Sequence, residues 1–125
     1  MERTFPAKAR ALRDIRTFIR ERAALDDVPG TLTDDIVLAV SEASANAVVH
    51  VSTGSIRIRW RKQGDVVFVE VCDEGIFQEA TSTPQLDGIG GRGIPLMQAL
   101  MDDVTLHRGT NRCPGTVVCL AKRTG

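Results

Sequence analysis

The chain has 125 residues, 42% of them hydrophobic, and its 16 basic and 16 acidic residues give a formal net charge of +0. This size suits one hydrophobic core, so we expect residues 1–125 to form a single domain. The balanced charge argues against a general nucleic-acid-binding protein, and no apolar run reaches the roughly 18 residues of a membrane helix. Because the N-terminus also lacks the apolar segment of a signal peptide, we expect the protein to be cytoplasmic.

Two helices are predicted in the first half of the chain. Residues 8–25 have helical periodicity, because apolar side chains recur at three- and four-residue steps and form one stripe. Opposite that stripe Arg13, Arg16 and Arg20 form a basic ridge, which is either a solvated face or a docking surface for an acidic partner. Residues 31–34 have the form of a capping box with two acidic residues in the first turn, which predicts a helix from about residue 32 to about residue 50.

Strands dominate the second half. Residues 55–61 alternate strictly between apolar and basic side chains, residues 63–65 form a turn, and residues 66–73 form the return strand of a hairpin. A loop over residues 74–93, a helix over 94–101 and two strands over 104–108 and 116–122 follow. This order predicts an α+β fold: a two-layer sandwich of a largely antiparallel sheet with helices on one face.

The three cysteines do not indicate a metal site. Cys72, Cys113 and Cys119 form no CxxC pair, and the chain has only two histidines, so the spacing of a zinc site is missing. We expect all three cysteines to be reduced thiols.

The segment SEASANAVVH contains an acid and an amide on one side of the second helix. Glu42 and Asn46 are four residues apart, so their side chains point the same way. Carboxylate and amide oxygens are hard ligands that suit Mg²⁺, and a carboxylate beside such an ion can accept a proton from an attacking hydroxyl. The alternative is a solvated polar stripe on an amphipathic helix.

Asp73 ends the return strand of the first hairpin. It shares a strand face with Val67, Val69 and Val71, so its carboxylate is expected to point into the layer between sheet and helices. A buried carboxylate needs a partner, which an adenine amino group could provide, and Gly75 would let the ring lie against the backbone. The alternative is that Asp73 only begins a turn.

Glycines are concentrated immediately before the third predicted helix. Gly88, Gly90, Gly91 and Gly93 can bring backbone amides around phosphate oxygens at a helix N-terminus, and Arg92 adds positive charge. The spacing fits neither a dinucleotide fingerprint nor a Walker A loop. The alternative is a flexible loop.

Together these motifs resemble the GHKL ATPase superfamily, and most closely its anti-sigma-factor serine kinases. The family's N box, Glu-x-x-x-Asn-Ala, matches Glu42 and Asn46, and its first glycine box, Asp-x-Gly-x-Gly, matches Asp73 and Gly75. The second glycine box resembles GRGIPLMQALMDDV, which begins at Gly91, and a late Gly-Thr pair ends at Thr116. The motifs follow the family's order and span nearly the whole chain.

The resemblance implies a Bergerat-type fold that binds ATP and Mg²⁺. It implies Asn46 as the metal ligand and Glu42 as the catalytic base. The residues that it implies around the nucleotide are Asn46, Asp73, Gly75, Gly91, Arg92, Gly93, Ile94 and Thr116. The activity implied is a protein serine kinase that phosphorylates a STAS-domain anti-anti-sigma factor and sequesters a sigma factor, in a homodimer that contacts neither nucleic acid nor membrane.

Two differences from the family pattern define an alternative function. Phe77 replaces the second glycine of the first glycine box, and the segment from Gln78 to Ile89 is short for an ATP lid. These features favour a non-catalytic module of a bacterial stress-signalling pathway, in which the nucleotide sets partner affinity by favouring one loop conformation. A histidine-kinase catalytic domain fits less well, because no upstream dimerisation helix with a phosphoacceptor histidine is present.

Overall fold

The computed structural model describes residues 1–50, 54–73, 93–108 and 115–124. Five strands form one sheet in the order β1-β2-β3-β5-β4, and every neighbouring pair is antiparallel. The strands are β1 (Glu2–Pro6), β2 (Ser55–Gln63), β3 (Val66–Asp73), β4 (Asp103–Arg108) and β5 (Thr116–Arg123), and the helices are α1 (Ala11–Leu25), α2 (Gly30–His50) and α3 (Gly93–Leu100).

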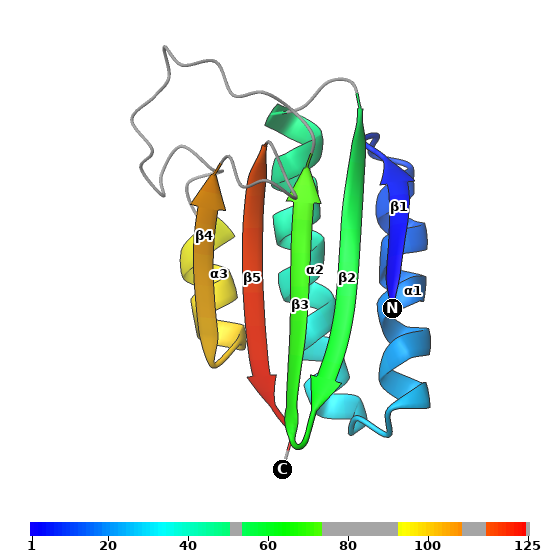
Figure 1. The fold of residues 1–125 in the computed structure, drawn as a ribbon, viewed down its shortest axis with the longest axis vertical. Helices are drawn as coiled ribbons and strands as arrows, with labels where there is room; N and C mark the ends of the chain where they lie inside the picture. The colour runs from blue at the N-terminus through cyan, green and yellow to red at the C-terminus, as the bar shows by residue number, and fades with distance from the viewer. Residues whose placement is uncertain (51–53, 74–92, 109–114, 125) are drawn as a thin grey trace.

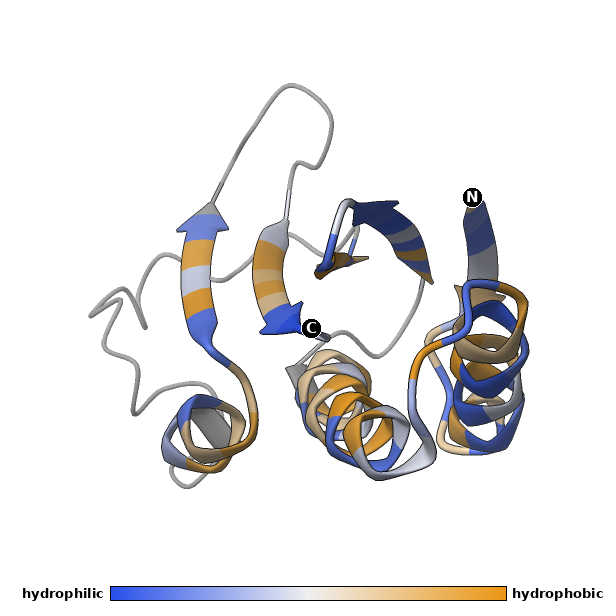
Figure 2. Cartoon of the chain, turned by 90° about the horizontal axis from the view of Figure 1, so that it is seen from below, coloured by the Kyte–Doolittle hydropathy of each residue, from blue (hydrophilic) through white to orange (hydrophobic). Residues whose placement is uncertain are grey.

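The three helices lie side by side in one layer against a single face of the sheet (Figures 1 and 2). Chain order explains this arrangement, because α1 and α2 follow one another before the first hairpin and α3 precedes the second. The predicted α+β sandwich, with an antiparallel sheet and helices on one face, is therefore confirmed. None of the helices that the structure describes is long and apolar enough to cross a membrane.

The core lies between the helix layer and the sheet. In β2 the residues Ile56, Ile58 and Trp60 are fully buried, as the alternation of that strand predicted. Trp60 is 1% exposed, and its indole Nε1 donates a hydrogen bond of 2.6 Å to Asp26 Oδ2, just beyond the end of α1. A buried indole N–H usually finds such an acceptor, so this bond joins the helix layer to the sheet at a polar point within the apolar core.

β1 was not predicted. Its residues are exposed except for Phe5, so the segment lacks the alternation that marks a half-buried strand. It nevertheless pairs with β2 from Glu2 opposite Arg59 to Pro6 opposite Ser55. The N-terminal ammonium extends this pairing, because it donates to the Trp60 carbonyl at 3.0 Å. The backbone of β2, rather than a local pattern in β1, therefore determines this strand.

The start of α2 differs from the prediction. The helix begins at Gly30, and its first turn contains no acidic residue. Thr31, which the capping box would have placed just before the helix, lies inside it, and the Thr33 hydroxyl donates to the Pro29 carbonyl at 3.1 Å. The predicted capping box is therefore wrong, because the helix already includes the residues that were expected to cap it.

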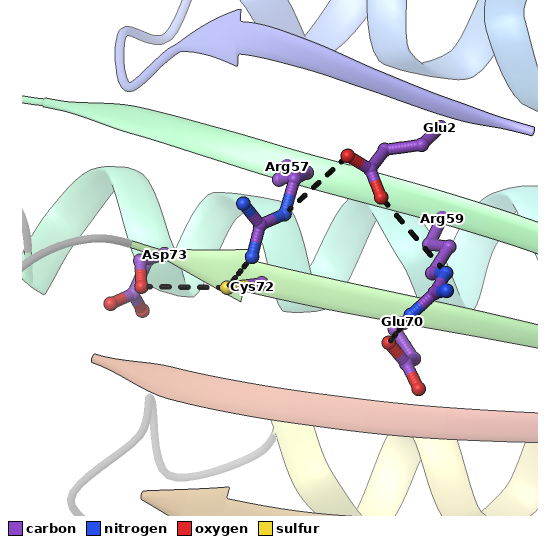
Figure 3. Close-up of polar contacts among 6 residues, drawn as sticks. All are labelled: Glu2, Arg57, Arg59, Glu70, Cys72 and Asp73. Atoms are coloured by element: carbon purple, nitrogen blue, oxygen red, sulfur yellow. Dashed lines mark hydrogen bonds and ion pairs between the residues drawn. The ribbon is translucent and has the colours of Figure 1, made fainter. Parts of the chain in front are cut away.

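The face of the sheet away from the helices carries interleaved charges. Figure 3 shows Arg59 between two carboxylates, with Nε 3.9 Å from Glu2 and a terminal guanidinium nitrogen 3.6 Å from Glu70. Arg57 lies 3.9 Å from the other oxygen of Glu2 and donates to Cys72 Sγ at 3.6 Å. These ion pairs are at least partly exposed, so they contribute little to stability and mainly keep this face polar.

The cysteines differ in state. Cys119 on β5 is a free thiol, and burial raises its pKa, with the charges of Glu70 and Asp103 adding to the increase. Cys72 is disulfide-bonded, so the expectation of a reduced thiol is wrong at that position. Cys113 lies outside the described residues.

Candidate functional site

Several predicted site residues lie at one end of the sandwich, the upper end in Figure 1. β3 ends there at Asp73, β5 begins there at Thr116, and the last turns of α2, which carry Asn46, lie behind them. α3 begins at the same end with Gly93. Residues far apart in the sequence are therefore gathered because strands and helices end or begin at a common edge.

The register of the sheet places Asp73 beside Thr116. Cys72 lies opposite Val117 in the antiparallel pair of β3 and β5, so the next residue along β3 meets the first residue of β5. The Thr116 backbone N–H donates to Asp73 Oδ1 at 3.2 Å. Asp73 is 5% exposed and Thr116 is 3% exposed, so this bond is shielded from water. The expectation that the carboxylate of Asp73 is buried is confirmed, and its direction into the layer between sheet and helices stays a prediction.

The position of Asp73 restricts what it can do chemically. A carboxylate that is removed from water is costly unless hydrogen-bond donors face its oxygens. One donor is the backbone N–H of Thr116. A carboxylate has further lone pairs on two oxygens, and an exocyclic amino group of a base is a donor of suitable size. The geometry is therefore compatible with adenine recognition by Asp73, which stays a prediction.

Glu42 and Asn46 lie on the half-exposed side of α2, one turn apart as predicted. The small neighbours Ala43 and Ala47 are buried in the core beneath them. Among the described residues, the side-chain nitrogen of Asn46 is buried and has no hydrogen-bond partner. A buried amide without a partner costs about 1–3 kcal/mol, so a bound group that pairs with this side chain would offset that cost.

The Asn46 amide also fits the metal that the sequence prediction requires. Its other terminal atom is an oxygen, and rotation of the amide exchanges donor and acceptor. Within the described ranges, no cluster of three or more His, Cys, Asp or Glu could hold a metal ion. A magnesium ion bound through Asn46 would take its other ligands from phosphates and water, as Mg²⁺ commonly does.

The predicted phosphate-binding residues are described only in part. Gly75, Gly91 and Arg92 lie outside the described residues. Gly93 and Ile94 are the first two residues of α3, which begins one residue earlier than predicted. The N-terminus of α3 therefore lies at the site end of the molecule, where its free N–H groups and dipole favour an anion.

Sequence reasoning missed a residue that fastens α3 at the opposite end. Lys122 on β5 donates from Nζ to the Leu100 carbonyl at 2.5 Å, at the last residue of α3, and its Nζ lies 3.4 Å from Asp35 on α2. The side chain of Lys122 is 14% exposed. The alternation of residues along β5 could have predicted this position, because Lys122 lies on the same, helix-facing side of the strand as Val118 and Leu120. One ammonium thus joins β5, α2 and α3.

Comparisons with known proteins agree on one family of ATPase domains. The family model described as the histidine kinase-like ATPase domain matches residues 5–122. The serine-protein kinase RsbW of Staphylococcus aureus is 28% identical, over 98% of this chain and 85% of its own. The anti-sigma F factor of Thermoanaerobacter pseudethanolicus is 29% identical, over 100% of this chain and 94% of its own.

A solved structure agrees with these relatives. The crystal structure of the RsbU and RsbW domains of a Mycobacterium tuberculosis protein superposes with a TM-score of 0.76 at 26% identity. The match covers 98% of this chain, which spans about a third of that longer one, 32% of its length.

Proposed function

Because the chain belongs to the histidine kinase-like ATPase domain family, we propose that it is an ATP-dependent protein serine kinase that also acts as an anti-sigma factor. Relatives that carry the names serine-protein kinase and anti-sigma F factor support this assignment. Its substrate would be a small STAS-domain anti-anti-sigma factor, and its second partner a sigma factor. The proposal includes a single domain, a homodimer and a location in the cytoplasm, where sigma factors act.

The observation that supports the proposal most directly is the buried carboxylate of Asp73. It lies 5% exposed at the same end of the molecule as Asn46, whose amide nitrogen lacks a partner among the described residues. Burying a carboxylate costs free energy even when donors face its oxygens, and the unpaired buried amide of Asn46 adds a further cost. A bound nucleotide that hydrogen-bonds to both side chains would offset part of this cost.

Each residue has a distinct part in the proposed reaction. Asp73 would accept a hydrogen bond from the adenine amino group, beside the N–H of Thr116 that it already binds. Gly75, Gly91, Arg92, Gly93 and Ile94 would surround the phosphates. When bound, Mg²⁺ through Asn46 would offset the negative charge of those phosphates. Glu42 would accept the proton of the substrate serine hydroxyl.

Replacement of the proposed base tests this function. STAS-domain proteins of the source organism are incubated with the protein and Mg-ATP, and phosphoserine is measured by mass spectrometry. Glu42→Gln keeps the shape of the side chain and removes the base, so phosphoryl transfer should fall by about 10²–10⁴-fold, the usual contribution of general base catalysis. ATP affinity, measured by calorimetry, should stay within twofold or so of the wild type.

The same experiment separates the alternative function. A nucleotide-gated binding module would bind a STAS-domain protein in an ATP- or ADP-dependent way without phosphorylating it. In that case Glu42→Gln would leave partner regulation unchanged. The absence of phosphoserine in a partner that demonstrably binds the wild-type protein would refute the kinase proposal.

A further inference from the structure

One side of α2 carries apolar residues that the fold leaves in solvent. Val49 is 75% exposed and Leu38 is 46% exposed, although most apolar residues of this helix are buried. Residues 38, 42, 45 and 49 recur at steps of four, three and four, so they lie along one side of the helix. We call this row, Leu38, Glu42, Ala45 and Val49, the α2 ridge.

Two ion pairs fix the direction in which the ridge points. Asp34 pairs at 3.0 Å with Arg20 of α1, and Asp35 pairs at 3.4 Å with Lys122 of β5. These consecutive residues are about 100° apart around the helix, and the side between them lies opposite the buried Ile36, Val40 and Ala43, so it faces away from the sheet. The α2 ridge continues that side, and Figure 2 shows that the far side of α2 is not covered by another described element.

We infer that the α2 ridge is the docking surface for the phosphoacceptor protein, an inference that rests on the proposed kinase function. Glu42 lies within the ridge, between Leu38 and Val49. A serine can transfer its proton to Glu42 only if the protein that carries it covers this part of α2. The occupant is therefore a folded protein that presents a serine next to apolar surface.

The dimensions of the ridge support this occupant. At about 1.5 Å per residue, Val49 lies roughly 10 Å and Leu38 roughly 6 Å from Glu42 along the helix axis. A protein interface of standard size covers about 800 Å² on each partner, a patch roughly 30 Å across. A partner that reaches Glu42 therefore buries both apolar side chains.

The chemistry of the ridge also matches the centre of an interface. Its only charged residue is Glu42, and the centres of protein interfaces are depleted in charge and contain well-buried apolar side chains. Ala45 is small and leaves room next to Glu42 for the approach of the acceptor loop. The apolar residues thus supply affinity around the single group that would act on the serine.

The test changes the two apolar residues and keeps Glu42. Leu38→Gln and Val49→Gln introduce a residue that is compatible with a helix at exposed positions, so the fold should persist. Leu25→Gln is the matched control, because Leu25 is 67% exposed at the end of α1, away from the ridge. The probe is the STAS-domain protein that the wild-type kinase phosphorylates, together with its acceptor Ser→Ala form for binding without chemistry.

For the double variant we expect the KM for the STAS-domain protein to rise about tenfold, typical of losing interface anchors. The dissociation constant for the Ser→Ala form should rise in parallel, and kcat and the KM for ATP should be unchanged. Leu25→Gln should behave as wild type. Unchanged KM and binding in the double variant would overturn the inference while leaving the kinase function in place.

Other outcomes are also decisive. If the double variant changes the sedimentation of the protein alone and not its binding to the STAS-domain protein, the ridge contacts a second copy, and the inference is wrong. If the Ser→Ala form binds through the ridge but the wild-type partner is not phosphorylated, the docking surface stands and the kinase function fails. If no STAS-domain protein binds, both are refuted.

Discussion

The substitution Asp73→Asn tests nucleotide recognition with little disturbance of the fold. Asparagine has the same shape as aspartate and keeps one oxygen, which can still accept the hydrogen bond that the Thr116 N–H now donates at 3.2 Å. The other oxygen becomes an NH₂ group, a donor, which would face the adenine amino group, also a donor. The change therefore replaces one acceptor by a donor at a single atom.

Burial sets the size of the expected effect. Asp73 is 5% exposed, so water cannot reach the mismatched pair and relieve it. A buried donor left without an acceptor costs about 1–3 kcal/mol. Since 1.4 kcal/mol corresponds to a factor of ten, ATP should bind roughly ten- to a hundredfold more weakly.

Calorimetric titration with Mg-ATP and with Mg-ADP measures this effect. Urea unfolding of the unliganded protein shows whether the variant is folded, and Asp103→Asn, at an exposed position in β4, controls for the loss of one negative charge. A folded Asp73→Asn protein that binds ATP with wild-type affinity would show that Asp73 does not recognise adenine.

Three further variants test other parts of the structure. Asp26→Ala leaves the buried Nε1 of Trp60 without its acceptor and should lower the free energy of unfolding by about 1–3 kcal/mol. Urea unfolding followed by the fluorescence of this single tryptophan measures the effect, and an unchanged free energy would mean that water replaces the carboxylate. Lys122→Met removes the donor at the end of α3 and should lower the free energy of unfolding by about 1–2 kcal/mol, which corresponds to a melting temperature several degrees lower in calorimetry. An unchanged melting temperature would show that the ammonium does not hold the helix. Reversal of Arg13 and Arg16 to Glu should slow association with the sigma factor at low salt, without altering ATP affinity, in surface plasmon resonance; equal rates at low and moderate salt would indicate a merely solvated face.

The fold could be predicted where the spacing of apolar residues along the sequence matches the residues that are buried. β2 and β3 alternate between two environments, and their predicted and observed spans agree closely. β1 could not be found in this way, because at the edge of the sheet only Phe5 reaches the core. The start of α2 was misplaced for a related reason: Thr31 can cap a helix or lie within its first turn, and only the surrounding fold decides between the two.

The site could be predicted to a similar extent. Strand parity correctly predicted that Asp73 is buried, and helix spacing placed Glu42 one turn from Asn46. The bond from Thr116 to Asp73 depends on the register of two strands 43 residues apart, which no local pattern contains. The role of Lys122 was missed because its partners, a helix carbonyl and an acid on α2, are brought together only by packing.

The pairing of β1 with β2 has a consequence for how the protein folds. Gln63 and Val66 pair across a tight turn in which Gly64 has a φ of 59°, so the β2–β3 hairpin can form from neighbouring residues. Glu2 and Arg59 are 57 positions apart, and closing so long a loop delays their pairing. We therefore expect β1 to join after the central strands and to leave first. The N-terminal edge of the sheet would then exchange its amide protons with solvent sooner than the rest of the sheet.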